Sequence, residues 1–593
     1  MQIKNWHANA LIFCVVWAVY YPALFAPLCS VDDLRMVTDL TNRPEIGWSD
    51  VWFPKSVTYY RPLISGSFIL NLLLWNLETP FLHFENILLH WLNVWLVFVL
   101  TRLVARRLVL DEVKVPLVAA LIFALHPINT EAVIWIAGRA DLFAGTFVLL
   151  CLVSTFKFLQ SAHRSWLLAV LISFFAGCLA KETALFVFPG VVFLSLLLRQ
   201  HARSLAHSAW AWSSPALACL LGAGGYFVLR LYALRNRDLG LQHLASMVTP
   251  PPVNPDVIAA AQPHQSTGEL LWVNVQTAVS VAGFYARKIV QPLPLNFGII
   301  DVPAGYFWVG CILILFGLYL MLRLTWPGCF LLTAMSLGSI AVLVALGDIS
   351  WTPIAERYMY TPAAMTAIGV SIAGAGVLRR VESDRWHTVV SCCLPMLLFA
   401  LGGTVLQRGF VWQDNLTLFA DTVEKSPDFA LARNELATAL WQRGRSQEAL
   451  ALVAELDVPD TQQASLNKVL VHIEEGRLEE ARLLLLNKLQ SEHSAAYRAT
   501  IMKQLEKISE MRQRRTEDPN EIVEYKQERL VYLNQLLQGT RDPFYHYRIG
   551  QLQMSLGDKD GAQKSFAAAF ALLPEGSLYK GPAGKLAESL LER

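Results

Sequence analysis

The sequence is short of charge, and it lacks the compact motifs by which many soluble enzymes hold phosphate, zinc or a nucleophile. Charged residues make up 16% of the 593 positions, against about 25% in soluble globular domains. The sequence contains no glycine-rich phosphate loop, no HExxH and no GxSxG. Because each of these chemistries needs its residues at fixed spacing, their absence argues against nucleotide-loop, zinc-peptidase and serine-hydrolase mechanisms.

Paired cysteines and a strong charge bias are also lacking. The nine cysteines are scattered, mostly inside apolar runs, and none forms a CxxC pair. Cys392 and Cys393 are adjacent, which does not suit a simple disulfide. We interpret the cysteines as small buried hydrophobes. The net charge of +2 favours no class of partner, and we expect no nucleic acid.

What the sequence does have is repeated apolar runs, which stop near residue 408. Hydrophobic residues make up 54% of the chain, and from Trp412 onward the sequence becomes polar and helix-prone. The pattern predicts an all-α protein with a membrane domain over 1–408 and a soluble helical domain over 409–593. We expect eleven spans, at 8–28, 83–104, 115–127, 141–160, 166–180, 183–198, 208–229, 304–322, 328–347, 361–378 and 388–407.

The loop arginines orient these spans. A cytoplasmic N-terminus and eleven spans collect most loop Arg and Lys on the cytoplasmic side, as the positive-inside rule requires. If 270–290 also spanned, Arg323, Arg379 and Arg380 would move outside, so we expect that stretch to be interfacial or re-entrant. This topology places loops 29–82 and 230–303, and the whole tail, on the outside. The N-terminus lacks a small-x-small cleavage site and predicts an uncleaved first span.

The tail carries a helix-turn-helix repeat. Three segments, 443–450, 475–482 and 556–563, share a turn glycine followed five residues later by an alanine. The first two turn glycines, Gly444 and Gly476, are 32 residues apart, close to the tetratricopeptide period of about 34. A degenerate repeat is expected in 485–540. Such solenoids bind protein on a concave face; the alternative is an irregular helical domain.

Ionisable residues gather at the predicted outward ends of the spans. Charges there are costly and usually face a cavity or a partner. The orientation came from arginines of the other face, so this gathering is an independent signal of one polar site. Its cations suit a lipid-borne phosphate, and a carboxylate could take a proton from a hydroxyl acceptor. The residues are Asp32, Asp33, Arg61, His83, Glu85, His126, Glu131, Arg139, Asp141, Lys181, Glu182, Glu356, Arg357 and Tyr360.

Each of these groups also has a purely structural interpretation. Asp32 and Asp33 could stop one helix and cap the next. His83, with Asn86 and His90, could join helices by hydrogen bonds. Lys181 with Glu182 could be an ion pair at a span end, and Glu356 with Arg357 could lock two helices together.

Taken together, the motifs resemble a known family. They are an acid pair after the first span, "YRPL" at 60–63, P-x-x-H-x-x-N-x-x-x-H at 80–90, "HPINTEAVIWIAGRADL", "KE", "ERYMY" and the repeat tail. This set resembles the integral membrane C-type (GT-C) glycosyltransferases. It is most similar to the branch with transmembrane and tetratricopeptide segments, which transfers mannose to protein hydroxyls, and to bacterial relatives that glycosylate surface proteins such as pilins.

The resemblance implies a polyprenyl-phosphate sugar donor, an outward-facing site and inversion at the anomeric carbon. The catalytic base would be Asp32 or Asp33, with Asp32 favoured. Donor phosphate would be held by Arg61, Arg139, Lys181 and Arg357. Residues orienting donor or acceptor would be His83, His126, Glu131, Asp141, Glu182, Glu356 and Tyr360. No cofactor is expected, although Asp32, Asp33 and Glu131 together could hold a divalent cation.

The expected partners are the lipid-linked donor, the membrane and a protein acceptor bound with help from the tail. A tail shorter than in animal relatives favours a bacterial inner-membrane protein with periplasmic repeats. One alternative function is sugar transfer to a lipid or polysaccharide carrier. Another is a non-catalytic scaffold or transporter that docks through its tail. A transporter should show charges near mid-membrane and repeated halves, and the sequence shows neither.

Overall fold

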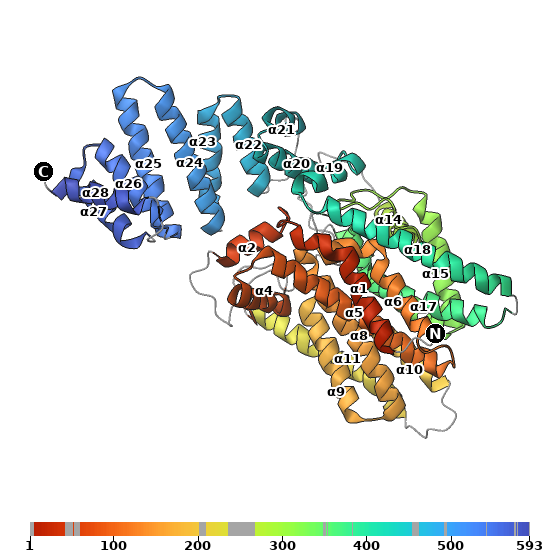
Figure 1. The fold of residues 1–593 in the computed structure, drawn as a ribbon. Helices are drawn as coiled ribbons and strands as arrows, with labels where there is room; N and C mark the ends of the chain where they lie inside the picture. Colours follow the sequence, from red (N-terminus) through yellow and green to blue (C-terminus); the bar gives the residue numbers. More distant parts are fainter. Residues whose placement is uncertain are drawn as a thin grey trace. The chain divides into compact units, whose positions relative to one another are not determined.

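The structure is a computed structural model that describes residues 5–41, 51–52, 60–200, 209–234, 267–347, 352, 354–381, 384–453, 462–491, 495–540, 542–573, 577 and 579–591. Across these residues the chain is helical, with one isolated β-bridge between Ile299 and Ile354, which confirms the all-α prediction. Two compact units are present: unit 1 takes in 1–37 and 45–429, and unit 2 takes in 38–44 and 430–593 (Figure 1).

Unit 1 is a bundle of long apolar helices joined by short 3-10 turns. The 3-10 turns are η1 (Tyr21–Phe25), η2 (Pro127–Asn129), η3 (Ile136–Gly138), η4 (Glu182–Val187) and η5 (Glu356–Met359). The α-helices that begin before residue 430 are α1 (Asn5–Tyr20), α2 (Asp33–Thr41), α4 (Pro62–Trp75), α5 (Thr79–Arg107), α6 (Lys114–Leu125), α7 (Thr130–Ile134), α8 (Arg139–Ser161), α9 (Arg164–Ala180), α10 (Phe188–Gln200), α11 (Ala209–Leu234), α14 (Thr267–Val290), α15 (Tyr306–Leu322), α16 (Trp326–Gly347), α17 (Tyr360–Leu378), α18 (Asp384–Val411) and α19 (Asn415–Lys425).

Every predicted span corresponds to a helix. Among the described residues, eight segments are long and apolar enough to cross a membrane, and a ninth is counted if α6 and its continuation η2–α7, bent by 53°, form one span. The predicted spans 166–180 and 304–322 are α9 and α15, of 17 residues each, about 25 Å long against a bilayer core of about 30 Å. The chain is therefore a multi-pass membrane protein. Helix α14, over the ambiguous stretch, is not among the candidate spans.

The 3-10 turns gather at one end of the bundle, which we call the site face. Turn η2 packs on η5, and helix α18 packs on both η1 and η2. Proline lies at the start of two of the turns, as the second residue of η1 (Pro22) and the first residue of η2 (Pro127). Since proline removes a backbone donor and blocks helix continuation, these spans break where they reach the site face.

Unit 2 is a stack of helix pairs, visible in Figure 1 as α22 to α25 lying side by side. Its helices are α20 (Ala430–Gln442), α21 (Ser446–Val453), α22 (Gln462–Glu474), α23 (Leu478–Ser491), α24 (Ala495–Arg515), α25 (Pro519–Thr540), α26 (Phe544–Ser555), α27 (Lys559–Leu572) and α28 (Lys580–Leu591). The predicted degenerate region is the hairpin α24–α25, whose helices run 21 and 22 residues.

The repeat turns have the geometry that the glycines predicted. All three glycines are left-handed, with φ of 72° at Gly444, 78° at Gly476 and 86° at Gly557. The next residue donates its N–H to the carbonyl five residues earlier, which defines a Schellman helix end; Arg477 N lies 2.8 Å from His472 O. The paired alanines are fully buried, namely Ala449, Ala481 and Ala562. The tetratricopeptide-like solenoid is confirmed.

A glycine substitution tests this turn. We expect Gly476→Ala to destabilise the full-length protein by about 1 kcal/mol, because a Cβ is strained in the left-handed region. The thermal midpoint in detergent measures it. Gly581→Ala is the matched control, since Gly581 is exposed within α28 and an added Cβ meets nothing within 4 Å. An unchanged midpoint for Gly476→Ala would contradict the expectation.

Candidate active site

The two aspartates after the first span have different environments. Asp32 is exposed, and its φ of 64° puts it in the left-handed region, which aspartate tolerates. Its carbonyl accepts the Met36 N–H at 2.9 Å and so starts α2. Asp33 is only 1% exposed. The pair therefore presents one carboxylate to the outside and buries the other.

Asp33 anchors its loop to the rest of the site face. Its Oδ1 accepts the Ala137 N–H at 2.9 Å, and its Oδ2 accepts the Cys29 N–H at 3.2 Å. The Trp135 indole N–H also donates to Val31 O at 3.4 Å. The segment that carries Asp32 is thus fastened to η3, far away in the sequence.

Burial raises the pKa of the Asp33 carboxyl to about 8, although three backbone N–H donors favour its charged form. An unfolded aspartate titrates near about 3.9, so the folded chain holds this proton more tightly. The stability that the proton contributes is present at low pH and is lost as the pH rises from about 4 through about 8.

We therefore expect wild-type stability to fall more steeply between about pH 5 and about pH 8 than that of Asp33→Asn. The asparagine is isosteric with the neutral acid and cannot ionise. Thermal midpoints of both proteins across this range measure the effect. Parallel curves would show that Asp33 does not titrate in this window.

Arg139 lies at the centre of a fully satisfied buried network. Its guanidinium bonds to the side chain of Asn71, to Asn86 Oδ1 at 3.1 Å and to Leu82 O at 3.1 Å. It also pairs with Glu85 Oε2 at 3.2 Å. Arg139 is 0% exposed. These contacts join α4, α5 and α8.

Lys181 and Glu182 are neighbours in sequence but pair with different elements. Lys181 Nζ lies 2.6 Å from each oxygen of Asp141. Glu182 accepts from Arg61 at 2.9 Å and from Arg230 at 3.0 Å. The Arg61 side chain keeps 25% of its surface exposed, which makes it the most accessible of the four predicted phosphate ligands.

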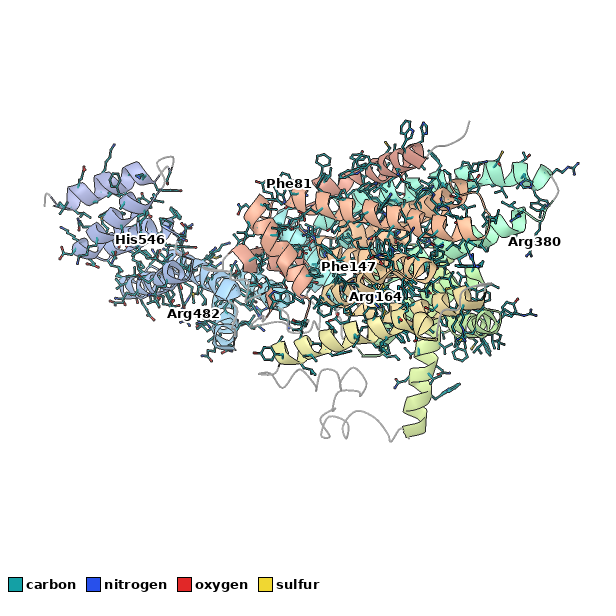
Figure 2. All side chains as sticks on the ribbon, turned by 90° about the horizontal axis from the view of Figure 1, so that it is seen from below. Phe81, Phe147, Arg164, Arg380, Arg482 and His546 are labelled. Carbon is teal, nitrogen blue, oxygen red and sulfur yellow. The ribbon has the colours of Figure 1, made fainter. Side chains whose placement is uncertain are left out.

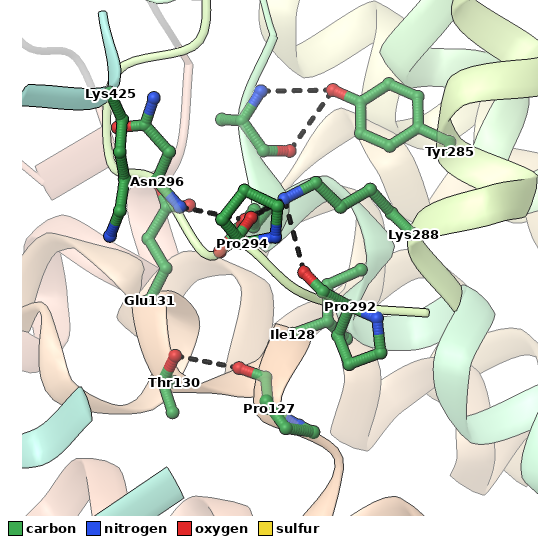
Figure 3. A network of polar contacts seen from close by, with 12 residues as sticks. Pro127, Ile128, Thr130, Glu131, Tyr285, Lys288, Pro292, Pro294, Asn296 and Lys425 are labelled. Carbon is green, nitrogen blue, oxygen red and sulfur yellow. Dashed lines mark hydrogen bonds and ion pairs between the residues drawn. The ribbon is translucent and has the colours of Figure 1, made fainter. Parts of the chain in front are cut away.

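Glu356 and Arg357 divide in the same way. Arg357 pairs with Glu131 through its guanidinium, and its N–H donates to Glu131 Oε2 at 3.1 Å. Glu356 Oε1 accepts from Lys288 Nζ at 2.7 Å and from the Asn296 N–H at 3.0 Å. Figure 3 shows Lys288 also reaching toward the carbonyl oxygens of Pro292 and Pro294.

The predicted histidines and Tyr360 act as interhelical hydrogen-bond partners. His126 Nε2 donates to Ile289 O at 2.8 Å, since its Nδ1 accepts the Ile128 N–H. His83 Nε2 lies 3.2 Å from Ala26 O. The Tyr360 hydroxyl lies 2.8 Å from His90 Nδ1 and 3.0 Å from the Asn93 amide. All are buried.

The structure therefore brings the predicted residues together at one end of the bundle. Tyr358 links two of the pairs, because Arg357 and Lys181 lie 5.0 and 5.3 Å from its ring centroid. Their roles in donor or acceptor binding stay predictions. Within the described ranges, no three His, Cys, Asp or Glu side chains are grouped to hold a metal ion.

Sequence reasoning missed several partners at this face. Arg230 and Lys288 complete ion pairs, and Asn71 and Trp75 bond to Glu85 or Arg139. The sequence did carry a signal for Lys288, because a cation within the partly apolar stretch 270–290 indicates a nearby acidic partner. Asn71 is the one amide side chain in the apolar helix α4, which is a signal for a buried partner.

Fold and site together define a multi-pass helical membrane protein with an ion-paired polar site at one end of its bundle and a tetratricopeptide-like solenoid. The tetratricopeptide repeat family matches residues 406–458. Protein O-mannosyl-transferase TMTC3 of Mus musculus is 26% identical over 489 residues, 75% of this chain and 50% of that protein. Protein O-mannosyl-transferase tmtc2 of Xenopus laevis is 33% identical over 173 residues, 27% of this chain and 20% of that protein.

These relatives bear the name of the branch that the motifs resemble, which confirms the resemblance. The chain spans half or less of the length of these two curated relatives. A solved oligosaccharyltransferase of Archaeoglobus fulgidus aligns with 70% of this chain and 56% of that one at 12% identity, with a TM-score of 0.34, a likeness that carries no argument.

The predicted division between a membrane domain and an outside domain at residue 408 stays a prediction. The boundary between the two compact units falls between Phe429 and Ala430. Much of the predicted loop 230–303 lies outside the described residues, as do 42–50 and 53–59 of the loop 29–82.

Proposed function

We propose that the protein is a membrane glycosyltransferase that moves a sugar from a polyprenyl-phosphate donor to a hydroxyl of a protein acceptor on the outer side of the membrane. The observation that carries the proposal is the division of the aspartate pair, with Asp32 exposed at the site face and Asp33 anchoring its loop. The names of the relatives support protein O-mannosylation as the type of reaction.

The chemistry divides among few residues. Asp32 takes the proton of the acceptor hydroxyl as its oxygen forms a bond to the anomeric carbon. The bond from that carbon to the donor phosphate breaks, and polyprenyl phosphate leaves with the electron pair. Attack from the opposite side inverts the anomeric centre. Asp32 is exposed, whereas Asp33 is buried with both oxygens accepting backbone N–H groups, so Asp32 is the carboxylate that an acceptor hydroxyl can reach.

Arg61 is the cation that best suits the leaving phosphate. It precedes α4, and it keeps exposed surface although it pairs with Glu182. Arg230 also pairs with Glu182, so Arg61 can turn toward a phosphate without leaving that carboxylate unpaired. Arg139, Lys181 and Arg357 are buried in their own ion pairs, and we assign them to positioning the loops.

The solenoid of unit 2 would bind the acceptor polypeptide, since stacked helix pairs of this kind present surfaces for protein. We further propose a bacterial inner-membrane location with these repeats in the periplasm. A pilin or another surface protein is the acceptor class that this location favours.

The test is a product analysis. Membranes containing the full chain, a radiolabelled polyprenyl-phosphate sugar and candidate acceptor proteins should yield label on protein that survives lipid extraction. Label appearing only in a new lipid or polysaccharide fraction would favour the carrier alternative. No transfer to any fraction, with donor and acceptors present, would favour the scaffold alternative.

A further inference from the structure

Two adjoining cavities open beside the ion-paired cluster, in unit 1. They have volumes of about 500 Å³ and about 420 Å³ and share the side chains of Arg287, Pro294 and Lys425. Neither includes any of the residues that sequence reasoning proposed for the sugar donor. The residues that line the two cavities therefore need an explanation of their own.

The larger cavity carries more positive charge than its own acid can neutralise. Arg287, Arg408 and Lys425 line it with a single carboxylate, Asp421. Arg408 and Lys425 both bond to Asp421, one to each oxygen. Within the described part of the chain, the half-buried Arg287 guanidinium has no hydrogen-bond or ion-pair partner. Three cationic side chains and one carboxylate line the cavity, which gives its lining a net charge of about +2.

The smaller cavity is less suited to an anion. It adds Lys288, but Glu356 already neutralises that residue at 2.7 Å. Two further carboxylates, Asp301 and Asp428, line it. The uncompensated charge therefore lies on the side of Arg408.

The larger cavity lies where a spanning helix ends. Thr404, Gln407 and Arg408 line it from the last turns of α18. The chain just beyond α18 bonds to the loop after the first span, with Asn415 donating to Leu28 O at 3.1 Å. The cavity is thus on the site face, and at the end of a span it is level with the phosphates of a bilayer.

An apolar track leads from the cavity along α18. Residues four and seven positions before Thr404 share its helix face, and these are Ala400 and Leu397, both exposed. Only 11% of the spanning window of this helix is buried in protein, so the track faces lipid. Leu293 and Leu295 add an apolar wall at the cavity.

We propose that this cavity binds the phosphate of a membrane lipid, with Arg287 as its principal ligand and the lipid tail lying along the Ala400–Leu397 face of α18. Charge-assisted bonds from guanidinium groups are the strong contacts by which proteins hold phosphate. The site is separate from Arg61 and Asp32, and it does not depend on sugar transfer.

The experiment uses the purified full chain in nonionic detergent and native mass spectrometry with four probes. These are dioleoyl phosphatidylglycerol, farnesyl phosphate, inorganic phosphate and, as a zwitterionic comparison, dioleoyl phosphatidylcholine. We expect wild type to retain one or both anionic lipids. Arg287→Gln should reduce that retention by at least about fivefold, since it removes a charge-assisted contact.

Arg380→Gln is the matched control. Arg380 is an exposed cation in the loop after α17, at the end of the bundle opposite the site face (Figure 2), and its substitution should leave retention unchanged. Thr404→Trp is a second variant that fills the cavity while keeping every charge, and it should also reduce retention. Farnesyl phosphate alone would identify an isoprenoid phosphate as the source, and phosphatidylglycerol a phosphoglyceride.

Two results would overturn the proposal. One is equal retention of the anionic lipids by wild type, Arg287→Gln and Thr404→Trp. The other is inorganic phosphate binding wild type as tightly as the lipids, which would make this a site for free anions.

Discussion

Asp32→Asn lowers sugar transfer by at least about 100-fold at unchanged protein abundance. General base catalysis contributes about 10² to 10⁴ in rate, and an asparagine at this exposed position cannot take the proton. Because Asp32 is exposed and starts α2 through its backbone carbonyl, the substitution removes little packing. Sugar mass on an acceptor protein, divided by the amount of folded enzyme, measures the effect.

Asp33→Asn is the variant to compare with Asp32→Asn in the same experiment. Its amide has one oxygen and can accept only one of the two backbone N–H groups that the two carboxyl oxygens of Asp33 accept, so the substitution should lower the thermal midpoint. Activity per folded molecule should fall much less than in Asp32→Asn. Full transfer by Asp32→Asn would falsify the assignment of Asp32 as the base, and full transfer by the double variant as well would exclude both aspartates.

Arg139→Ala destabilises the protein by about 3–5 kcal/mol, the cost of leaving buried partners of a charge unpaired. Glu85, Asn71 and Asn86 each lose one contact to the guanidinium, and Leu82 O loses its donor. We expect poor accumulation in membranes and a thermal midpoint well below that of wild type. The measurement is fluorescence-monitored unfolding in detergent.

Arg61→Ala is the matched comparison at the same face. Because Arg61 is partly exposed and Glu182 keeps Arg230 as a partner, its removal should cost only about 1 kcal/mol. Transfer should nevertheless fall, if Arg61 holds the leaving phosphate. Equal destabilisation by both substitutions would show that Arg61 is as structural as Arg139.

The fold was predictable because its signals are local. Apolar runs mark spans wherever they occur, and the glycine and alanine of each repeat report a turn and a close helix contact a few residues apart. Gly476 and Ala481 are an example, since one is left-handed and the other fully buried. The two short helices α9 and α15 matched predicted spans because composition, rather than length, identified them.

The gathering of charges at one face was predictable, and their pairing was not. The order of the predicted spans along the chain places Lys181, Glu182, Glu131 and Asp141 at the same end of the bundle. Which acid meets which base depends on the path of loops far apart in sequence, such as Lys288 reaching Glu356. The difference between Asp32 and Asp33 likewise depends on the Ala137 N–H, over a hundred residues away.

The dipeptides Lys181–Glu182 and Glu356–Arg357 have a consequence beyond their ion pairs. Each sends its two opposite charges to two different neighbours: Asp141 and Arg61 in one case, Lys288 and Glu131 in the other. Adjacent Cα atoms are about 3.8 Å apart. Each dipeptide therefore limits how far apart its two ion-pair partners, and the elements that carry them, can lie. Order along the chain therefore sets the spacing of the site, and exchanging the two residues would keep the composition and net charge while losing that spacing.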